Sequence, residues 1–107
     1  TAVDAVERLC QHANQGAYID FAAPGVDIWT ISQTGQGKYR SGTSYATPYA
    51  MAIAAMYLMQ NRATSKENIY NAMKANTHDL GKTGHDKIFG WGLAKVSKKL
   101  CPETTSD

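Results

Sequence analysis

The pattern of hydrophobic and polar positions predicts three short strands followed by two helices. Residues 1–6 carry small and β-branched side chains, residues 17–23 are rich in Tyr, Ile and Phe, and residues 26–31 alternate between apolar and polar positions. Each of these segments is therefore a candidate strand. A turn signal precedes the second of them at residues 14–16, and Pro24-Gly25 is expected to end it.

A long apolar segment follows. Residues 49–59 are rich in Ala and Met and lack Gly and Pro, which predicts a helix. This helix is apolar nearly all round, so it must be covered on several sides, and we expect part of the covering surface to lie outside these 107 residues. A membrane span is the competing interpretation, because the 21 residues from 41 to 61 are uncharged and a span needs ~20. The first third of this stretch is small and polar, which leaves about 12 apolar residues, the length of a buried core helix; no membrane span is therefore expected.

The pattern after residue 63 predicts a second, amphipathic helix. The run Thr64-Ser65-Lys66-Glu67 has the form of a capping box, in which the Thr64 hydroxyl accepts from the backbone N–H of Glu67. One face of the helix is expected to be buried and the other solvated: Ile69, Ala72, Met73 and Asn76 on the first, Glu67, Asn71 and Lys74 on the second. Farther along, we expect a short basic helix over residues 93–100 and a frayed tail over residues 101–107.

Composition narrows the class of protein. Hydrophobic residues make up 43% of the 107 residues and charged residues 19%, with 9 Gly and 3 Pro, which excludes collagen-like, low-complexity and disordered chains. The length allows one domain or a piece of one. The net charge of +2 forms no dense run, so no nucleic-acid partner is expected. The chain opens without a signal peptide or an initiator Met, which suggests a processed product or an excised segment.

Two cysteines, Cys10 and Cys101, stand near opposite ends of the chain. They are too few and too far apart in sequence for a zinc site or a CxxC redox motif. A bridge between them would close a loop of about 90 residues and stabilise the fold by roughly 4 kcal/mol. The sequence leaves open whether they pair.

The candidate chemistry centres on Ser44. This serine lies between a glycine-bearing loop and the long apolar helix, where unpaired backbone N–H groups and the helix dipole would favour a developing anion. Gly42 permits a tight turn, Ala46 leaves room for substrate, and Pro48 is expected in the first helical turn, where its missing N–H costs little. The alternative is that Thr43 or Ser44 serves only as an N-cap, worth ~1 kcal/mol.

The residues around Ser44 resemble a known signature. Gly42-Thr43-Ser44-Tyr45-Ala46-Thr47-Pro48 is similar to the Gly-Thr-Ser-x-Ala-[Ser/Thr/Ala]-Pro sequence around the nucleophilic serine of the subtilisin family of serine endopeptidases. Upstream, Phe21-Ala22-Ala23-Pro24-Gly25-Val26 resembles the family's strand ending in Ala-Pro-Gly, and Gly90-Trp91-Gly92-Leu93 resembles a Gly-x-Gly-hydrophobic stretch near the end of its catalytic domain. A weaker match places residues 1–5 in the strand after the family's oxyanion-hole segment. The Gly-x-Ser-x-Gly elbow of α/β-hydrolases fails because Ala46 stands at its last position.

The resemblance implies a fold and a reaction. The fold is the α/β, three-layer α/β/α architecture with a mostly parallel sheet, of which residues 1–107 would form the C-terminal portion. The reaction is hydrolysis of a protein or peptide substrate through an acyl-enzyme on Ser44. The Ser44 backbone N–H would be one oxyanion donor, with Thr43 and Gly42 supporting the loop, and Tyr39 and Arg40 would contact the leaving-group side of the substrate. Tyr49 departs from the His that many family members have there.

Two of the family's catalytic motifs are missing from this sequence. The family's Asp and His motifs precede the serine, and this sequence contains neither. Because a serine without a general base is a poor nucleophile, we expect the chain alone to be inactive and its partner to be the upstream part of the same polypeptide. A non-catalytic pseudo-protease or interaction module that retains the fold is the alternative, and a membrane-anchored segment is a third interpretation.

The remaining titratable residues suggest no second chemistry. His12, His78 and His85 are expected to be ordinary surface histidines, with Asp79 and Asp86 as solvated charges. No metal site and no cofactor are expected, because further ligands are missing and no carboxylates cluster for the calcium that often stabilises the family. By resemblance, the location is extracellular or periplasmic, with which two cysteines are compatible.

Overall fold

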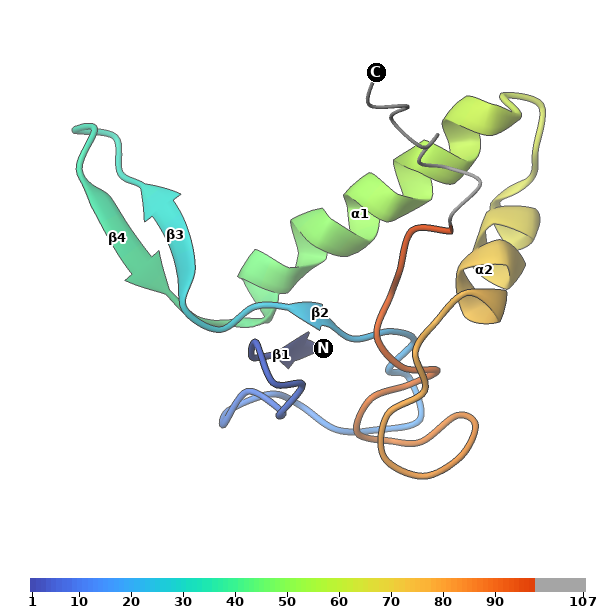
Figure 1. The fold of residues 1–107 in the computed structure, drawn as a ribbon, viewed down its shortest axis with the longest axis horizontal. Helices are drawn as coiled ribbons and strands as arrows, with labels where there is room; N and C mark the ends of the chain where they lie inside the picture. The colour runs from blue at the N-terminus through green and yellow to red at the C-terminus, as the bar shows by residue number, and fades with distance from the viewer. Residues whose placement is uncertain (98–107) are drawn as a thin grey trace, which may run out of the picture.

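The computed structural model of the protein describes residues 1–97, which form two small β-structures and two helices (Figure 1). In chain order the elements are β1 (Ala2–Val3), β2 (Ala23–Pro24), β3 (Ile28–Ile31), β4 (Gly37–Arg40), α1 (Thr43–Gln60) and α2 (Lys66–Ala75).

The sheet is narrow, and its two strands are parallel. β1 and β2 pair in parallel, with Ala2 opposite Ala23. Single bridges extend this pair on both sides, since Val3 pairs with Leu9 in antiparallel fashion and Ala22 pairs with Leu93 in parallel. The other side of Leu93 pairs with His78. Segments far apart in sequence thus combine into the α/β arrangement expected from the sequence.

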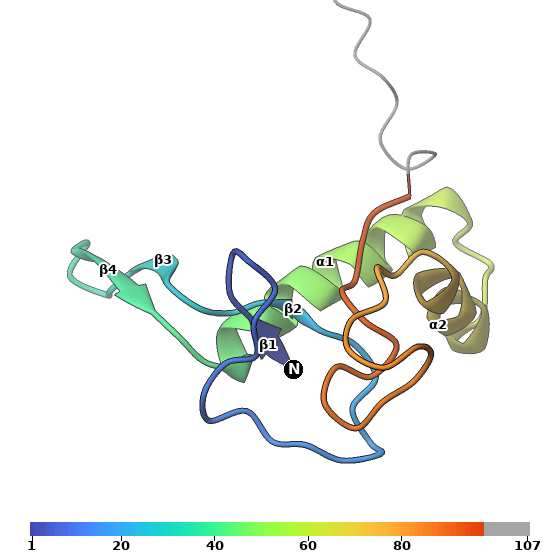
Figure 2. The same ribbon diagram turned by 60° about the horizontal axis from the view of Figure 1, so that its bottom comes forward.

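The β3–β4 hairpin lies apart from this sheet. Its strands are antiparallel, with Ile28 opposite Arg40 and Ile31 opposite Gly37. Figures 1 and 2 both show the hairpin projecting from the rest of the molecule at the end where α1 begins. The chain returns from β4 directly into α1.

The core consists of small clusters, and in two of them α1 packs on the sheet or on α2. Ala2, Ala23 and Ala46 form the first cluster and join α1 to β1 and β2. Ile53 of α1, Met73 of α2 and Ala94 form another. Such small side chains allow a close approach of helix and sheet, but they bury little apolar area.

The prediction of a helix over residues 49–59 is confirmed, and the helix is longer than expected. It begins at Thr43, so Pro48 lies inside it and not in its first turn, which corrects the expectation above. Since proline has no N–H, the carbonyl of Ser44 lacks the donor that residue i+4 supplies elsewhere in a helix. Most of α1 remains uncovered: only Ala46 and Ile53 are buried, while Met51 and Met59 are 66% and 75% exposed.

The prediction for α2 is right for its faces and wrong for its cap. Met73 is buried and Ile69, Ala72 and Asn76 are half-buried, whereas Glu67, Asn71 and Lys74 are exposed. The N-cap is Ser65 and not Thr64, because the Ser65 Oγ accepts from the backbone N–H of Asn68 at 3.1 Å. The helix therefore begins one residue later than the capping box predicts.

The predicted strands prove shorter. Residues 17–23 contribute only Ala23 to a strand, because the Asp20 carbonyl bonds outside the β1–β2 pair and Ala22 forms only a single bridge, to Leu93. The Asp20 carbonyl accepts from the backbone N–H of Trp91 and the Phe21 carbonyl from the amino group of Thr1. Pro24, expected to end the strand, belongs to it. Residues 1–6 contribute Ala2–Val3, and residues 26–31 contribute Ile28–Ile31.

The basic helix predicted over residues 93–100 is absent from its described part. Residues 93–97 are not helical, and Leu93 instead pairs with Ala22 and His78. The predicted tail and Cys101 lie outside the described residues, which therefore do not test whether Cys10 pairs with Cys101. Within residues 1–97, no helix is both long and apolar enough to cross a membrane.

Candidate nucleophile site

Ser44 is the second residue of α1 and is exposed. Its hydroxyl forms no hydrogen bond with any residue between 1 and 97, so it is free to meet a substrate. Buried Ala46, two residues farther on, packs against the sheet and anchors this first turn. The serine is thus accessible while the backbone that carries it is held in place.

The N-terminus of α1 has no side-chain cap within the described chain. The N-cap residue is Gly42, which has a φ of 154° that other residues rarely adopt. The first backbone N–H groups of a helix have no partner inside the helix, and here no side chain covers them. The N–H of Ser44 is one of them. Together with the positive end of the helix dipole, it provides the electrostatic environment that favours an oxyanion.

Three backbone-directed bonds hold the loop before Ser44. The N–H of Gly42 donates to the carbonyl of Gly25 at 2.8 Å, and the N–H of Asp27 donates to the Oγ of Ser41 at 2.9 Å. The N–H of Gly25 in turn donates to the carbonyl of Val3. The Ala-Pro-Gly segment therefore positions residues 41–45, the candidate nucleophile loop, relative to β1. Sequence reasoning missed Ser41, whose only signal was a hydroxyl close to two glycines.

A hydrogen bond joins Thr43 and Thr47. The carbonyl of Thr43 accepts from the Oγ1 of Thr47 at 3.0 Å, within the first turns of α1. The hydroxyl of Thr43 forms no hydrogen bond in the described chain, and its role in supporting the loop stays a prediction.

A pocket of about 360 Å³ lies beside Ser44. Its lining comes from two segments, residues 41–45 of the nucleophile loop and Cys10, His12 and Ala13 from the turn after β1. His12 is exposed, as expected of a surface histidine, yet it lines this pocket, which sequence reasoning did not foresee. No bond joins His12 to Ser44 in the described chain.

The other histidines and their neighbouring carboxylates lie away from Ser44. His78 is exposed, with its Nε2 3.6 Å from Glu7, whereas His85 is half-buried, with its Nε2 2.7 Å from the carbonyl of Ile19. The prediction of a surface histidine is therefore wrong for His85, because its ring packs edge-on against Trp91.

Asp79 and Asp86 are not simple solvated charges. The carboxylate of Asp79 accepts from the N–H of Gly84 at 2.6 Å, and that of Asp86 from the N–H groups of Ile88 and Phe89 at 2.8 Å. Each carboxylate closes a loop. Among residues 1–97, no three His, Cys, Asp or Glu side chains come together as a metal site.

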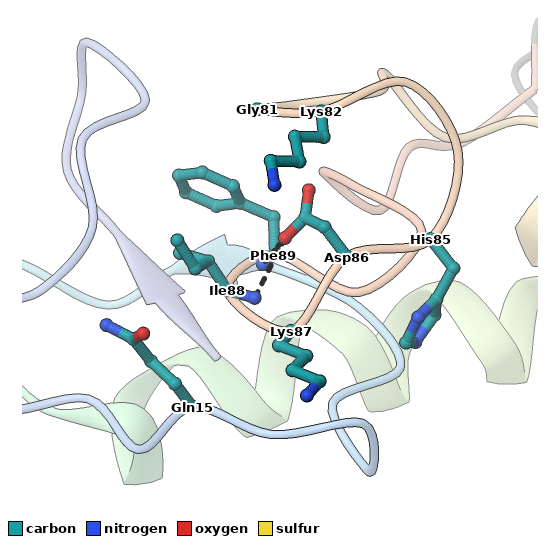
Figure 3. A pocket seen from close by; sticks show the side chains of 8 residues that line it. All are labelled: Gln15, Gly81, Lys82, His85, Asp86, Lys87, Ile88 and Phe89. Atoms are coloured by element: carbon teal, nitrogen blue, oxygen red, sulfur yellow. Dashed lines mark hydrogen bonds between the residues drawn. The ribbon is translucent and has the colours of Figure 1, made fainter.

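A larger pocket, of about 700 Å³, lies elsewhere (Figure 3). It is lined by Gln15, Gly81, Phe89 and residues 82 and 85–88. Figure 3 shows the Asp86 carboxylate turned back to the backbone of its own loop. Because no residue of the nucleophile loop lines this pocket, we place no chemistry in it.

Tyr39 and Arg40, expected on the leaving-group side, lie at the end of β4 and are both exposed. Arg40 directly precedes Ser41 in the nucleophile loop. Tyr39 packs edge-on against Trp29 with ring centroids 4.9 Å apart. The end of the hairpin is thus only a few residues before Ser44 in the chain. Contact of Tyr39 and Arg40 with substrate stays a prediction.

Comparisons with known proteins agree with this geometry. The model of the subtilase family, Peptidase_S8, matches residues 2–92. The minor extracellular protease Epr of Bacillus subtilis (strain 168) is 32% identical over 93 residues, which are 87% of this chain and 14% of that protein. The thermophilic serine proteinase of Bacillus sp. (strain AK1) is 35% identical over 83 residues, 78% of this chain and 20% of that protein.

A solved structure shares the fold. The crystal structure of MycP1 with its N-terminal propeptide removed superposes with a TM-score of 0.82 at 20% identity, over 99% of this chain and 36% of that one. The chain therefore spans only a minor part of the relatives that it matches. With its parallel sheet, its serine at the start of α1 and a family match from residue 2 to residue 92, the chain belongs to the subtilase family.

Proposed function

We propose that this chain is the nucleophile-bearing C-terminal portion of a subtilase endopeptidase. The observation that carries the proposal is the exposed Ser44 at the uncapped N-terminus of α1, within the Gly42–Pro48 signature. An accessible hydroxyl next to unpaired backbone N–H groups is what acyl transfer requires.

In the proposed reaction the Ser44 Oγ attacks the carbonyl carbon of a peptide bond while its proton passes to a general base. The negative charge that develops on the carbonyl oxygen is stabilised by the backbone N–H of Ser44. The C–N bond then breaks as the base returns the proton to the leaving amine, and water hydrolyses the resulting ester. The base and the residue that orients it come from the upstream part of the polypeptide.

The chain alone is proposed to be inactive. No histidine is bonded to Ser44 in the described chain, and neither the Asp nor the His motif of the family occurs in the 107 residues. The apolar side chains that α1 exposes, Tyr49, Met51, Leu58 and Met59, are the surface that the upstream part would cover. Extracellular action on protein or peptide substrates is supported by the kinship with the extracellular protease named above, and periplasmic action is the alternative.

The test is intact mass after treatment with a fluorophosphonate. We expect no adduct on the 107-residue chain and one adduct per molecule on the complete polypeptide, with Ser44→Ala abolishing it. An adduct on the chain alone that disappears in Ser44→Ala would show that a base exists within these residues and would overturn the proposed inactivity. A complete polypeptide that stays unlabelled would instead favour the non-catalytic module.

A further inference from the structure

The β3–β4 hairpin presents two different faces. Side chains alternate along each strand, and the register places Thr30 opposite Lys38, so these two residues and Arg40 share one face. Trp29 and Tyr39 share the other face, where the Trp29 ring also covers Gly37. The contact between Trp29 and Tyr39 stabilises the hairpin on the face opposite the one that carries the two cations.

The cations of this hairpin have no ion-pair partners in the part of the chain that the structure describes. Residues 28–40 contain Lys38 and Arg40 and no carboxylate. Within residues 1–97 neither side chain forms an ion pair, in contrast to Arg8, which pairs with Asp4 at 3.0 Å, and Lys74, which lies 3.8 Å above the ring of Trp91. Both charges of the hairpin are therefore available to an outside ligand.

A groove runs along the cationic face. It has a volume of about 370 Å³ and extends to the turn end of the hairpin, where Ile31 and Gly37 also line it. Its polar lining consists of Thr30, Ser32, Thr34, Gln36, Lys38 and Arg40. The Thr30 hydroxyl donates to the carbonyl of Lys38 at 2.9 Å, and the hydroxyls of Ser32 and Thr34 bond each other at 2.9 Å. The donors left for a ligand are therefore chiefly the amide of Gln36 and the two cations, and a guanidinium can bind a carboxylate through two parallel bonds. The groove thus suits a ligand that carries carboxylates.

We propose that this groove binds an acidic segment of the protein substrate, with two carboxylates separated by one residue. Lys38 and Arg40 are two positions apart on one strand, which places their backbones about 7 Å apart. An extended peptide presents its side chains i and i+2 on one face at the same spacing. Nucleic acid is a poorer fit, because two cations form too small a basic surface to follow a phosphate backbone.

The inference rests on the proposed function, because it assumes that the bound protein is the substrate of Ser44. Arg40 continues directly into Ser41, whose Oγ is fixed by the N–H of Asp27. A segment bound along the hairpin is therefore tethered close to the nucleophile loop. Such tethering raises the effective concentration of a nearby scissile bond.

The experiment measures peptide binding without cleavage. The complete polypeptide carrying Ser44→Ala is titrated into a fluorescein-labelled, extended twelve-residue peptide that contains Glu-Ser-Glu, and fluorescence anisotropy gives the Kd. We expect the double variant Lys38→Gln/Arg40→Gln to bind roughly five times more weakly, the size expected of two exposed charge pairs. The control Lys66→Gln/Lys95→Gln, which removes the same charge at exposed positions off the hairpin, should bind as the parent does.

Three results would overturn the inference: equal binding of a matched Gln-Ser-Gln peptide, equal loss in the two double variants, or oligothymidylate binding as tightly as the peptide through the same two residues. The outcome is separable from that of the proposed function. Fluorophosphonate labelling without peptide binding would refute the groove alone, whereas peptide binding without labelling would refute the peptidase and the role of the groove in substrate capture.

Discussion

Gly25 sets the distance between the sheet and the nucleophile loop. A Cβ at this position would lie 2.6 Å from the Cβ of Ala2, 2.8 Å from the carbonyl oxygen of Gly42 and 3.0 Å from the Cβ of Ala46. None of these atoms belongs to a flexible side chain, so the backbone itself would have to move. The glycine of the Ala-Pro-Gly segment is thus required by packing around the loop that carries Ser44.

We therefore expect Gly25→Ala to displace the nucleophile loop. In the complete polypeptide it should slow fluorophosphonate labelling of Ser44 at least tenfold and lower the free energy of unfolding by about 1–3 kcal/mol. Labelling rates and urea denaturation measure the two effects.

Gly16→Ala is the matched control, since its new methyl group meets only the exposed ring of Tyr18, which can swing away. Normal labelling in Gly25→Ala would mean that the close contacts around this glycine do not position Ser44.

At the scale of elements, α2 is preceded by two adjacent residues that could each cap its N-terminus, and only one of them does. Thr64 and Ser65 both precede the helix, and the sequence pattern favours Thr64 because Glu67 completes a capping box with it. In the structure the Ser65 Oγ accepts from the N–H of Asn68. The N–H of Thr64 is already used in a turn, donating to the carbonyl of Asn61 at 3.0 Å. The turn that leaves α1 therefore decides where α2 begins.

This assignment predicts that Ser65→Ala lowers the free energy of unfolding by ~1 kcal/mol, because the N–H of Asn68 loses its acceptor. Thr64→Ala, which leaves that bond intact, should cost less than half as much. Thermal unfolding of the two variants side by side measures the difference. A larger loss of stability in Thr64→Ala than in Ser65→Ala would show that Thr64 is the N-cap, as the sequence pattern predicts.

At the scale of the whole molecule, Tyr70 joins three segments that are far apart in the chain. Its hydroxyl donates to the Oδ1 of Asp20 at 3.0 Å and accepts from the Nε1 of Trp91 at 2.9 Å. The ring also packs against Phe21, with centroids 5.4 Å apart. The Gly-Trp-Gly segment is thus tied to α2 and to the segment that precedes β2.

The hydroxyl of Tyr70 makes stability depend on pH in the alkaline range. Desolvation, with the hydrogen bond to Asp20 and the charge of Asp20, raises its pKa above the usual value of 10.0, partly offset by the bond from Trp91. Because the folded state favours the protonated phenol, this contribution is complete below pH 10 and is lost as the pH rises through the folded-state pKa.

Tyr70→Phe removes this contribution. We expect it to lower stability at pH 7 by about 1 kcal/mol and to weaken the loss of stability above pH 10 relative to the parent. Urea denaturation at a series of pH values measures both. The same alkaline loss in parent and variant would show that other groups cause it.

Some parts of the site could be predicted from sequence because they depend on local chemistry. The Gly42–Pro48 signature identified Ser44, and the run of Ala and Met identified a helix that is apolar on all sides. The hydrogen bond of Ser41, the place of His12 in the lining of the pocket beside Ser44 and the partial burial of His85 could not be predicted, because each depends on a segment more than ten positions away.

The sequence by itself determined the two helices and the family, and it supplied the position of the proposed nucleophile, since backbone propensity, apolar periodicity and a contiguous motif are properties of neighbouring residues. Only the tertiary structure decided where the strands lie and which hydroxyl caps α2. The carbonyls of Asp20 and Phe21 are an example. Each has several potential donors, and in the folded protein the first accepts from the N–H of Trp91 and the second from the amino group of Thr1. A backbone hydrogen bond takes its partner from whatever the fold brings near, and no local pattern records that choice.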